Sequence, residues 1–229
     1  MIFHEKLKLK FDVEAMREEF VSVQQLGDRV GLWHGPAAFG GWALQSQDGD
    51  WRSGFEKGGL YKNTDDKLVA KEPALAIHEY HMRTSACTGI FSDIIDELEE
   101  QGFYPHRSRI TVLDPGQITI WHTDALDSCY SVRIHIPFIT NLDCAFEVQD
   151  EGAVHMPADG HAYLIDSSTT HRAYNKGTEI RMHFLAQVWP TKHSEHFIVN
   201  ESQKDISDFH NMKGYKIYQQ VMRDKAKGL

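Results

Sequence analysis

Cysteine is scarce in this chain, and long apolar runs are missing. Cys87, Cys129 and Cys144 are odd in number and form no CxxC pair, so neither a disulfide framework nor a structural zinc ribbon is expected. No window approaches about 18 consecutive apolar residues, and charged residues interrupt the apolar ones at the N-terminus. The sequence therefore predicts neither a transmembrane helix nor a signal peptide. Together with the unpaired cysteines, this predicts a cytoplasmic protein without a membrane partner.

Positive charge is also in short supply. The chain has 24 Lys and Arg against 33 Asp and Glu, a formal net charge of −9. A protein that binds the phosphate backbone needs a clustered basic surface, so nucleic acid is not an expected partner. The 229 residues contain no internal repeat and no Pro/Ser-rich linker, which favours one domain, 1–229. Histidine, in contrast, occurs 14 times and directs attention to metal chemistry.

Short strands separated by turns are expected in the middle of the chain. Between 107 and 189, alternating segments are interrupted by Asp-Pro-Gly, Pro-Ala-Asp-Gly and Asn-Lys-Gly, a pattern typical of a sandwich, jelly roll or barrel. One of the expected strands covers 118–124. Residues 2–11 are a candidate edge strand, and 31–60 are expected to form loops or short strands.

Helical spacing of apolar residues occurs on both sides of this core. Asp12 is a candidate N-cap for a first helix, 88–101 has one apolar face, and 203–226 returns to a helical pattern. The expected organisation is an N-terminal part (1–106), a β core (107–190) and a C-terminal helical segment (191–229), which makes the fold class mainly β with flanking helices.

Three residues in this core form a candidate metal site. His122 and Asp124 belong to Trp-His-Thr-Asp, and His171 lies on a later strand. Side chains two apart on a strand share a face, and a later strand can reach the same point. Two imidazoles and one carboxylate on one face of the metal are the ligand set of non-haem Fe(II) oxygenases, which leave positions open for a co-substrate and O₂. Arg181, ten residues after His171, can bind the carboxylate of such a co-substrate.

Each of these residues also has an ordinary structural interpretation. A His-x-Asp tripeptide is expected by chance in a chain so rich in histidine. Arg181 alone would be read as a surface arginine in an ion pair, and His135, between two isoleucines, as a buried core histidine. His155 and His161 flank a turn and are expected to be exposed. Trp33, Trp42 and Trp51 are expected to pack rather than to cover a site.

The motifs of the β core, in their order and spacing, resemble the aspartyl/asparaginyl β-hydroxylase family of 2-oxoglutarate-dependent oxygenases, which includes proline cis-4-hydroxylases. The matching segments are Arg-Ile-Thr-Val-Leu-Asp-Pro-Gly-Gln (109–117), Trp-His-Thr-Asp (121–124), Arg-Ile-His-Ile-Pro-Phe-Ile-Thr-Asn (133–141), Ala-Tyr-Leu-Ile-Asp (162–166) with His171 and Asn175, and Arg-Met-His-Phe-Leu (181–185). The resemblance implies a double-stranded β-helix, a cupin-like jelly roll.

The resemblance also implies roles for individual residues. His122, Asp124 and His171 would bind Fe(II). The distal carboxylate of 2-oxoglutarate would bind to Arg181 with help from the Thr111 hydroxyl. The two remaining residues, Arg133 and His135, would point into the site, His135 toward the co-substrate and Arg133 toward the carboxylate of the substrate. His183, on the same face as Arg181, is a candidate for a supporting position.

The expected function follows from this resemblance. Membrane-bound peptidyl hydroxylases of the family have glycine where this chain has Asp124, so a complete triad favours the branch with small substrates. We therefore expect hydroxylation of a free amino acid or similar small carboxylate, with O₂ consumed and succinate and CO₂ released. The alternatives are a peptidyl Asp/Asn β-hydroxylase and a non-catalytic cupin-like barrel that binds a metal or small acid. A homodimer is left open.

Overall fold

The computed structural model describes residues 4–31, 39–53, 60–62, 68–70, 80–122, 132–167 and 170–188. Asp124, Trp33 and the helical pattern predicted for 203–226 lie outside these ranges. No described helix is long and apolar enough to cross a membrane. The elements are β1 (His4–Lys10), α1 (Val13–Gln24), β2 (Val30–Gly31), β3 (Phe39–Ala43), β4 (Gln45–Ser46), β5 (Leu60–Lys62), β6 (Leu68–Ala70), β7 (Met82–Arg83), α3 (Gly89–Glu100), β8 (His106–Leu113), β9 (Val132–Ile139), β10 (Cys144–Val148), β11 (Gly152–Val154), β12 (His161–Asp166), β13 (His171–Asn175) and β14 (Arg181–Val188).

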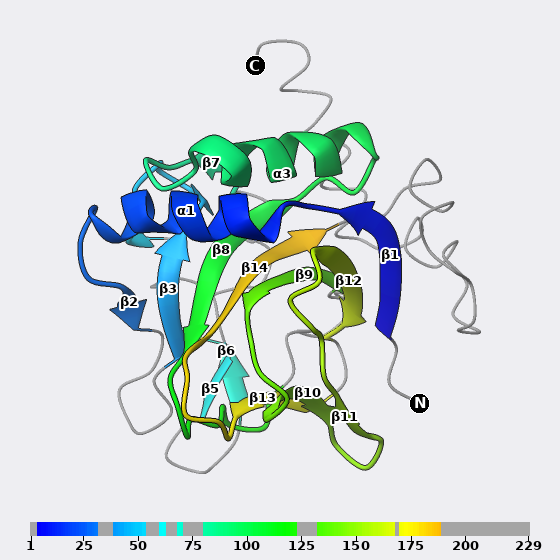
Figure 1. Cartoon of the computed structure of the whole chain (residues 1–229). Helices are drawn as coiled ribbons and strands as arrows, with labels where there is room; N and C mark the ends of the chain where they lie inside the picture. Colours follow the sequence, from blue (N-terminus) through cyan, green and yellow to red (C-terminus); the bar gives the residue numbers. More distant parts are fainter. Residues whose placement is uncertain are drawn as a thin grey trace, which may run out of the picture.

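A large antiparallel sheet with a smaller one forms the core of the molecule. The large sheet has the strand order β1-β12-β9-β14-β8-β3-β2, and the small sheet has the order β11-β10-β13. Helices α1 and α3 lie side by side across one face of the large sheet, and the small sheet lies toward its other side (Figure 1). This arrangement confirms the predicted class, mainly β with flanking helices and a jelly-roll core.

Helix α1 begins where the sequence predicts, and α3 lies within the predicted range 88–101. The carboxylate of Asp12 accepts hydrogen bonds from the backbone N–H groups of Glu14 and Ala15, so it caps α1. α3 ends before Gly102, which adopts a positive φ of 76° suited to glycine. Among the strands that the structure describes, the first, β1, pairs with β12 alone and lies at the edge of the large sheet, as predicted.

The face of the large sheet beneath the helices carries the main apolar core. Side chains alternate along each strand, so Ile110, Ile136 and Phe184, all fully buried, point to this face. Phe138 joins sheet to helices, because its ring lies 5.9 Å from that of Phe20 in α1 and 6.0 Å from that of Phe91 in α3.

The opposite face of the large sheet, called here the interior face, is much more polar. The strand registers place on it Arg109, Thr111, Leu113, Arg133, His135, Tyr163, Ile165, Arg181 and His183. A second apolar cluster, which joins Tyr163 and Ile165 to Phe146 and Val148 of β10, fills part of the space between the two sheets. The position of this polar face inside the molecule makes it the candidate for function.

The strand expected at 118–124 is wrong for the residues that the structure describes. Residues 117–122 run along β13 but pair with it only in two isolated bridges, Ile118 with Tyr174 and His122 with His171. The backbone N–H of Ala173 donates to the Thr119 hydroxyl at 2.8 Å instead of to a carbonyl. This side-chain contact shifts the register by one residue between the bridges and interrupts the ladder.

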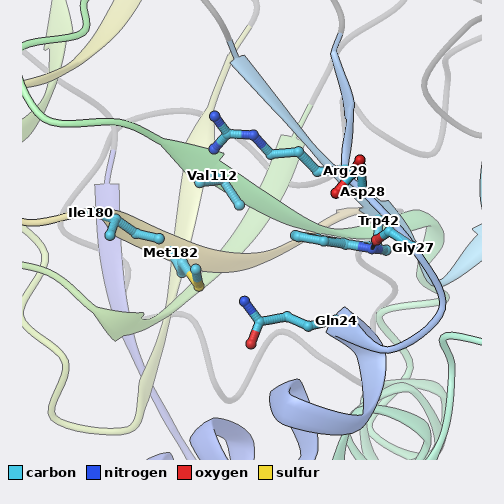
Figure 2. A pocket seen from close by; sticks show the side chains of 8 residues that line it. All are labelled: Gln24, Gly27, Asp28, Arg29, Trp42, Val112, Ile180 and Met182. Atoms are coloured by element: carbon cyan, nitrogen blue, oxygen red, sulfur yellow. Dashed lines mark hydrogen bonds between the residues drawn. The ribbon is translucent and has the colours of Figure 1, made fainter.

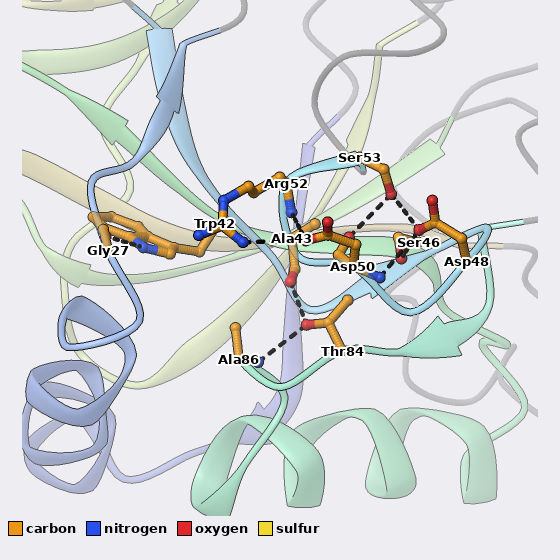
Figure 3. Close-up of polar contacts among 10 residues, drawn as sticks. All are labelled: Gly27, Trp42, Ala43, Ser46, Asp48, Asp50, Arg52, Ser53, Thr84 and Ala86. Carbon is orange, nitrogen blue, oxygen red and sulfur yellow. Dashed lines mark hydrogen bonds and ion pairs between the residues drawn. The ribbon is translucent and has the colours of Figure 1, made fainter.

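Several histidines and tryptophans can now be placed. His155 and His161 are half-buried rather than exposed. Nδ1 of His155 lies 2.8 Å from the carbonyl of Cys144, and Nδ1 of His161 lies 3.0 Å from the carbonyl of Leu7. Trp42 and Trp51 are buried and pack, as expected. The indole N–H of Trp42 donates to the carbonyl of Gly27 (Figure 3). In the same view, the Asp48 carboxylate accepts from the backbone N–H of Asp50 and from the Ser53 hydroxyl, which also lies within hydrogen-bond distance of the Asp50 carbonyl.

Candidate active site

Two of the three predicted metal ligands face each other. His122 and His171 form an antiparallel bridge in which each backbone N–H donates to the other residue's carbonyl, at 3.0 and 2.8 Å. Their rings lie 4.4 Å apart between centroids. His171 is buried and stacks on Phe146 of β10, with centroids 4.7 Å apart. The backbone bridge thus brings the two imidazoles together at the edge of the small sheet.

The hydrogen bonding of His122 suits a metal ligand. Its Nδ1 lies 2.8 Å from the carbonyl oxygen of Ile120, which can only accept, so Nδ1 carries the proton. The lone pair is then on Nε2, the usual arrangement in a histidine whose orientation is fixed for metal binding. No group of three potential metal ligands occurs within the described residues. The predicted third ligand, Asp124, lies outside them.

Arg181 is buried on the interior face, at 2 % exposure. Burial lowers the pKa of its guanidinium to about 10, so the group remains charged at neutral pH. Within the described part of the chain it forms no ion pair. The interpretation of Arg181 as an exposed surface arginine is therefore wrong. A buried cation of this kind is suited to a ligand that brings its own carboxylate.

His183 supports Arg181 from two residues away. Nη2 of Arg181 lies 3.1 Å from Nδ1 of His183, and a guanidinium can only donate, so Nδ1 accepts. Burial, and then the charge of Arg181, hold the pKa of His183 well below its usual value, so the ring is neutral with its proton on Nε2. That buried N–H has no hydrogen-bond partner among the described residues. His135 approaches the same Nδ1 with its own Nδ1, at 3.4 Å.

The remaining predicted residues all lie on the interior face. Thr111 pairs with His183 across the β8–β14 ladder and donates its hydroxyl to the His183 carbonyl at 3.3 Å. Arg133 and His135 are both buried and share the face of β9, as expected from their spacing. His135 also contacts Phe146 edge to face, with centroids 6.2 Å apart. Phe146 therefore contacts the rings of both His135 and His171.

Arg109 is a buried interior residue that the sequence analysis did not single out. It is 3 % exposed and lies opposite Leu185 on the face of Thr111. The sequence contains the signal for this position, because Arg109 precedes Thr111 by two residues on the same strand and must share its face. Among the side chains that the structure describes, four arginines are buried and no Asp or Glu is.

A separate pocket of about 500 Å³ opens on the other side of the large sheet (Figure 2). Val112 and Met182 line it from the strands, and Gln24 lines it from the end of α1. Val112 and Met182 are neighbours of Thr111 and Arg181 in sequence but point to the opposite face, so this pocket is not part of the histidine site.

The chain is similar to known proteins in sequence and in structure. A model of the aspartyl/asparaginyl β-hydroxylase family matches residues 11–191. Among solved structures, a Pseudomonas putida prolyl-4-hydroxylase is similar over 83 % of this chain and 94 % of its own, with 8 % identity and a TM-score of 0.49. A Burkholderia pseudomallei oxidoreductase of the 2OG-Fe(II) oxygenase family is similar over 84 % of both chains, with 14 % identity and a TM-score of 0.43. A Bordetella pertussis cupin domain is similar over 35 % of this chain and 80 % of its own, with 20 % identity and a TM-score of 0.28. No curated protein sequence matched the chain.

Proposed function

The chain belongs to the aspartyl/asparaginyl β-hydroxylase family, whose model spans most of it, and from this premise we propose the reaction and the role of each residue. The protein is a hydroxylase of the 2-oxoglutarate-dependent class. In our proposal it hydroxylates an unactivated C–H bond of a free amino acid or similar small carboxylate. It consumes 2-oxoglutarate and O₂ and releases succinate and CO₂. Fe(II), when bound, supplies the oxidising chemistry, and the chain supplies ligands, orientation and a buried interior face.

The observation that carries this proposal is the pairing of His122 with His171. Two imidazoles with ring centroids 4.4 Å apart, one of them with its proton held on Nδ1 by the Ile120 carbonyl, suit a divalent metal. His122, His171 and Asp124 would hold the iron. This ligand set is supported by the tautomer that the Ile120 carbonyl fixes on His122.

The 2-oxoglutarate site is assigned to Arg181 and its neighbours. Arg181 would bind the distal carboxylate through two parallel N–H donors, because it is buried and has no carboxylate partner in the described chain. Neutral His183 holds the guanidinium from behind. In this proposal the Thr111 hydroxyl assists at the same carboxylate and His135 lies beside the co-substrate.

The substrate is assigned to the remaining interior surface. Arg133 is buried beside His135 on β9, and we assign it to the carboxylate of an amino acid substrate. Phe146, Tyr163 and Ile165 keep water away from this space, which strengthens the electrostatic interactions of the arginines. Binding of a small acid in this way would fix which C–H bond faces the metal.

Two measurements test the function. Mixing the protein with Fe(II) and 2-oxoglutarate under anaerobic conditions should produce the weak visible charge-transfer band of the chelate. In air, a screen of the free amino acids for succinate release and for a product heavier by one oxygen atom should identify the substrate. H122A should lose the band and R181A should lose 2-oxoglutarate binding.

The results also separate the alternatives. A folded protein that shows no band, or H122A and R181A variants with full succinate production, would show that the site is wrongly assigned. A chelate without succinate release from any substrate would indicate a non-catalytic binding barrel. Turnover with Asp- or Asn-containing peptides but no free amino acid would indicate a peptidyl hydroxylase.

A further inference from the structure

Beside the histidine pair, Arg172 makes a cation–π contact with Trp121 and an ion pair with Glu147. The Arg172 guanidinium lies 4.3 Å from the ring centroid of Trp121, and its Nε donates to Oε2 of Glu147 at 2.6 Å. Both charged side chains are about three-quarters buried, at 27 % and 26 % exposure. Trp121 immediately precedes His122, and Arg172 immediately follows His171. We call these three side chains the outer clasp.

The side chains of Trp121 and Arg172 lie on the opposite face of the two backbone segments from the imidazoles of His122 and His171. His122 and His171 oppose each other in an antiparallel bridge, so Trp121 and Arg172 are the next neighbours across the same two chains. Side chains alternate between the faces of extended chains, so these two point away from the imidazoles. Glu147 of β10 is directly opposite Arg172 in the small sheet. The clasp therefore connects three adjacent segments behind His122 and His171.

The segment that carries His122 is not a regular strand, although backbone hydrogen bonds join Gln117, Thr119 and His122 to β13. Residues 117–122 are joined to β13 by isolated bridges and not by a continuous ladder, since the Thr119 hydroxyl replaces one backbone acceptor. The bridge at His122 is the last described contact of this segment with β13. A contact between Trp121 and Arg172 restrains the same pair of residues from their other face.

We propose that Arg172 is a positioning residue that holds His122 and His171 at the spacing needed for a divalent metal, acting through Trp121 and Glu147. This inference rests on the proposed function, because it assumes that the histidine pair binds metal. Arg172 does not touch the metal in this proposal. Its effect is to limit how far the two rings separate when no metal is bound, so its loss weakens metal binding.

The chain contains a matched control for this contact. Arg52 lies 4.2 Å from the ring centroid of Trp51 and is ion-paired with Asp50 at 3.7 Å. It has the same three chemical groups as the outer clasp, but it is located in the turn after β4, away from the histidine pair. R52Q should therefore remove the same kinds of contact at a more exposed position, with 56 % side-chain exposure against 27 % for Arg172, without affecting the metal site.

The test is titration of the full-length protein with Co(II), which replaces Fe(II) and is stable in air. Visible d–d absorption reports the ligand geometry, and calorimetry gives the dissociation constant. We expect R172Q to weaken Co(II) binding about tenfold, as is typical when a group that orients a ligand is lost, and R52Q to leave it within about twofold. R172K, which keeps the charge but loses the planar fork, should lie between them.

The thermal unfolding of the metal-free variants separates positioning from general stability. If Arg172 acted only on stability, R172Q and R52Q would lower the unfolding temperature but leave the Co(II) constant and spectrum unchanged, and the inference would be overturned. The double variant W121L/R172Q should weaken Co(II) binding no more than the stronger single variant. Additive losses would contradict action through Trp121.

Failure of the inference and failure of the proposed function look different. If wild-type protein binds Co(II) and H122A does not, the metal site stands, and equal binding by R172Q then refutes the positioning role alone. If the wild type and H122A bind Co(II) equally, the metal assignment itself is wrong and the inference falls with it.

Discussion

The guanidinium of Arg181 donates from Nη2 to Nδ1 of His183 at 3.1 Å, inside the molecule and along one face of β14. Because the acceptor nitrogen must be free of a proton, this contact requires a neutral histidine. Burial and the positive charge of Arg181 both favour that neutral form and lower the pKa of His183. The pair thus fixes the orientation of a buried cation without neutralising it, which leaves the charge available for a carboxylate.

Loss of the His183 acceptor should weaken the binding of 2-oxoglutarate. A hydrogen bond to a charged group contributes about 1.5–3 kcal/mol, and about 1.4 kcal/mol corresponds to a tenfold change in binding. We expect H183L to raise the KM for 2-oxoglutarate about tenfold with a smaller effect on kcat, measured by succinate release. H183N places an amide oxygen near the position of Nδ1 and should restore most of the affinity. Equal KM values for H183L and H183N would contradict the orienting role.

The pKa of His183 also predicts how stability depends on pH. In the unfolded chain this histidine has an ordinary pKa near 6.5, whereas in the folded protein the pKa is well below it. The unfolded state therefore takes up a proton first as the pH falls. The contribution of neutral His183 is complete above about pH 7 and is lost as the pH decreases below 6.5, by at most about 1.4 kcal/mol per pH unit.

The free energy of unfolding in urea, measured for the wild type and for H183N between pH 8 and pH 5.5, gives this contribution as the difference between the two pH profiles. H183N should lose less stability than wild type on acidification, because its side chain does not titrate. H81N, which changes an exposed histidine, serves as the control and should follow the wild type. Parallel pH profiles for H183N and wild type would rule out a neutral buried His183.

Replacement of Arg181 by methionine should separate ligand binding from stability. The lowered pKa of Arg181 shows that burial of its charge is costly, and a buried cation without a carboxylate contributes little to folding. R181M should therefore stay within about 1 kcal/mol of the wild-type stability in the absence of ligand. With Co(II) present, 2-oxoglutarate at 100 times its Kd should stabilise the wild type by about 2.7 kcal/mol and R181M not at all. Stabilisation of R181M by 2-oxoglutarate would place the distal carboxylate elsewhere.

Local patterns in the sequence were sufficient for most of the elements and for part of the site. The Asp12 cap, the apolar face of α3 and the strands β8, β9 and β14 follow from side-chain spacing, which depends only on nearby residues. His122 and His171 could be proposed as a pair because the motif that contains His122 and the later strand were recognisable.

Features that depend on contacts between distant segments could not be predicted in this way. The Thr119 hydroxyl interrupts the ladder with β13 and removes an expected strand, and no local signal indicates that a side chain will replace a carbonyl. His155 looked exposed because its partner, the carbonyl of Cys144, is brought to it by tertiary folding. Arg109 was different, because its position two residues before Thr111 already placed it on the interior face.

The helix-covered side of the large sheet should govern stability without controlling the site. Phe138 is fully buried between Phe20 and Phe91, so F138A removes packing on both helices and leaves a cavity. We expect a loss of about 3–5 kcal/mol in the free energy of unfolding in urea, with a smaller loss for F138L. L142A, at a leucine that is 88 % exposed, should have almost no effect. The His122–His171 bridge belongs to the other sheet and does not contact Phe138, so the folded fraction of F138A should bind Co(II) with nearly wild-type affinity. Weaker Co(II) binding by folded F138A would show that the two faces of the sheet are coupled.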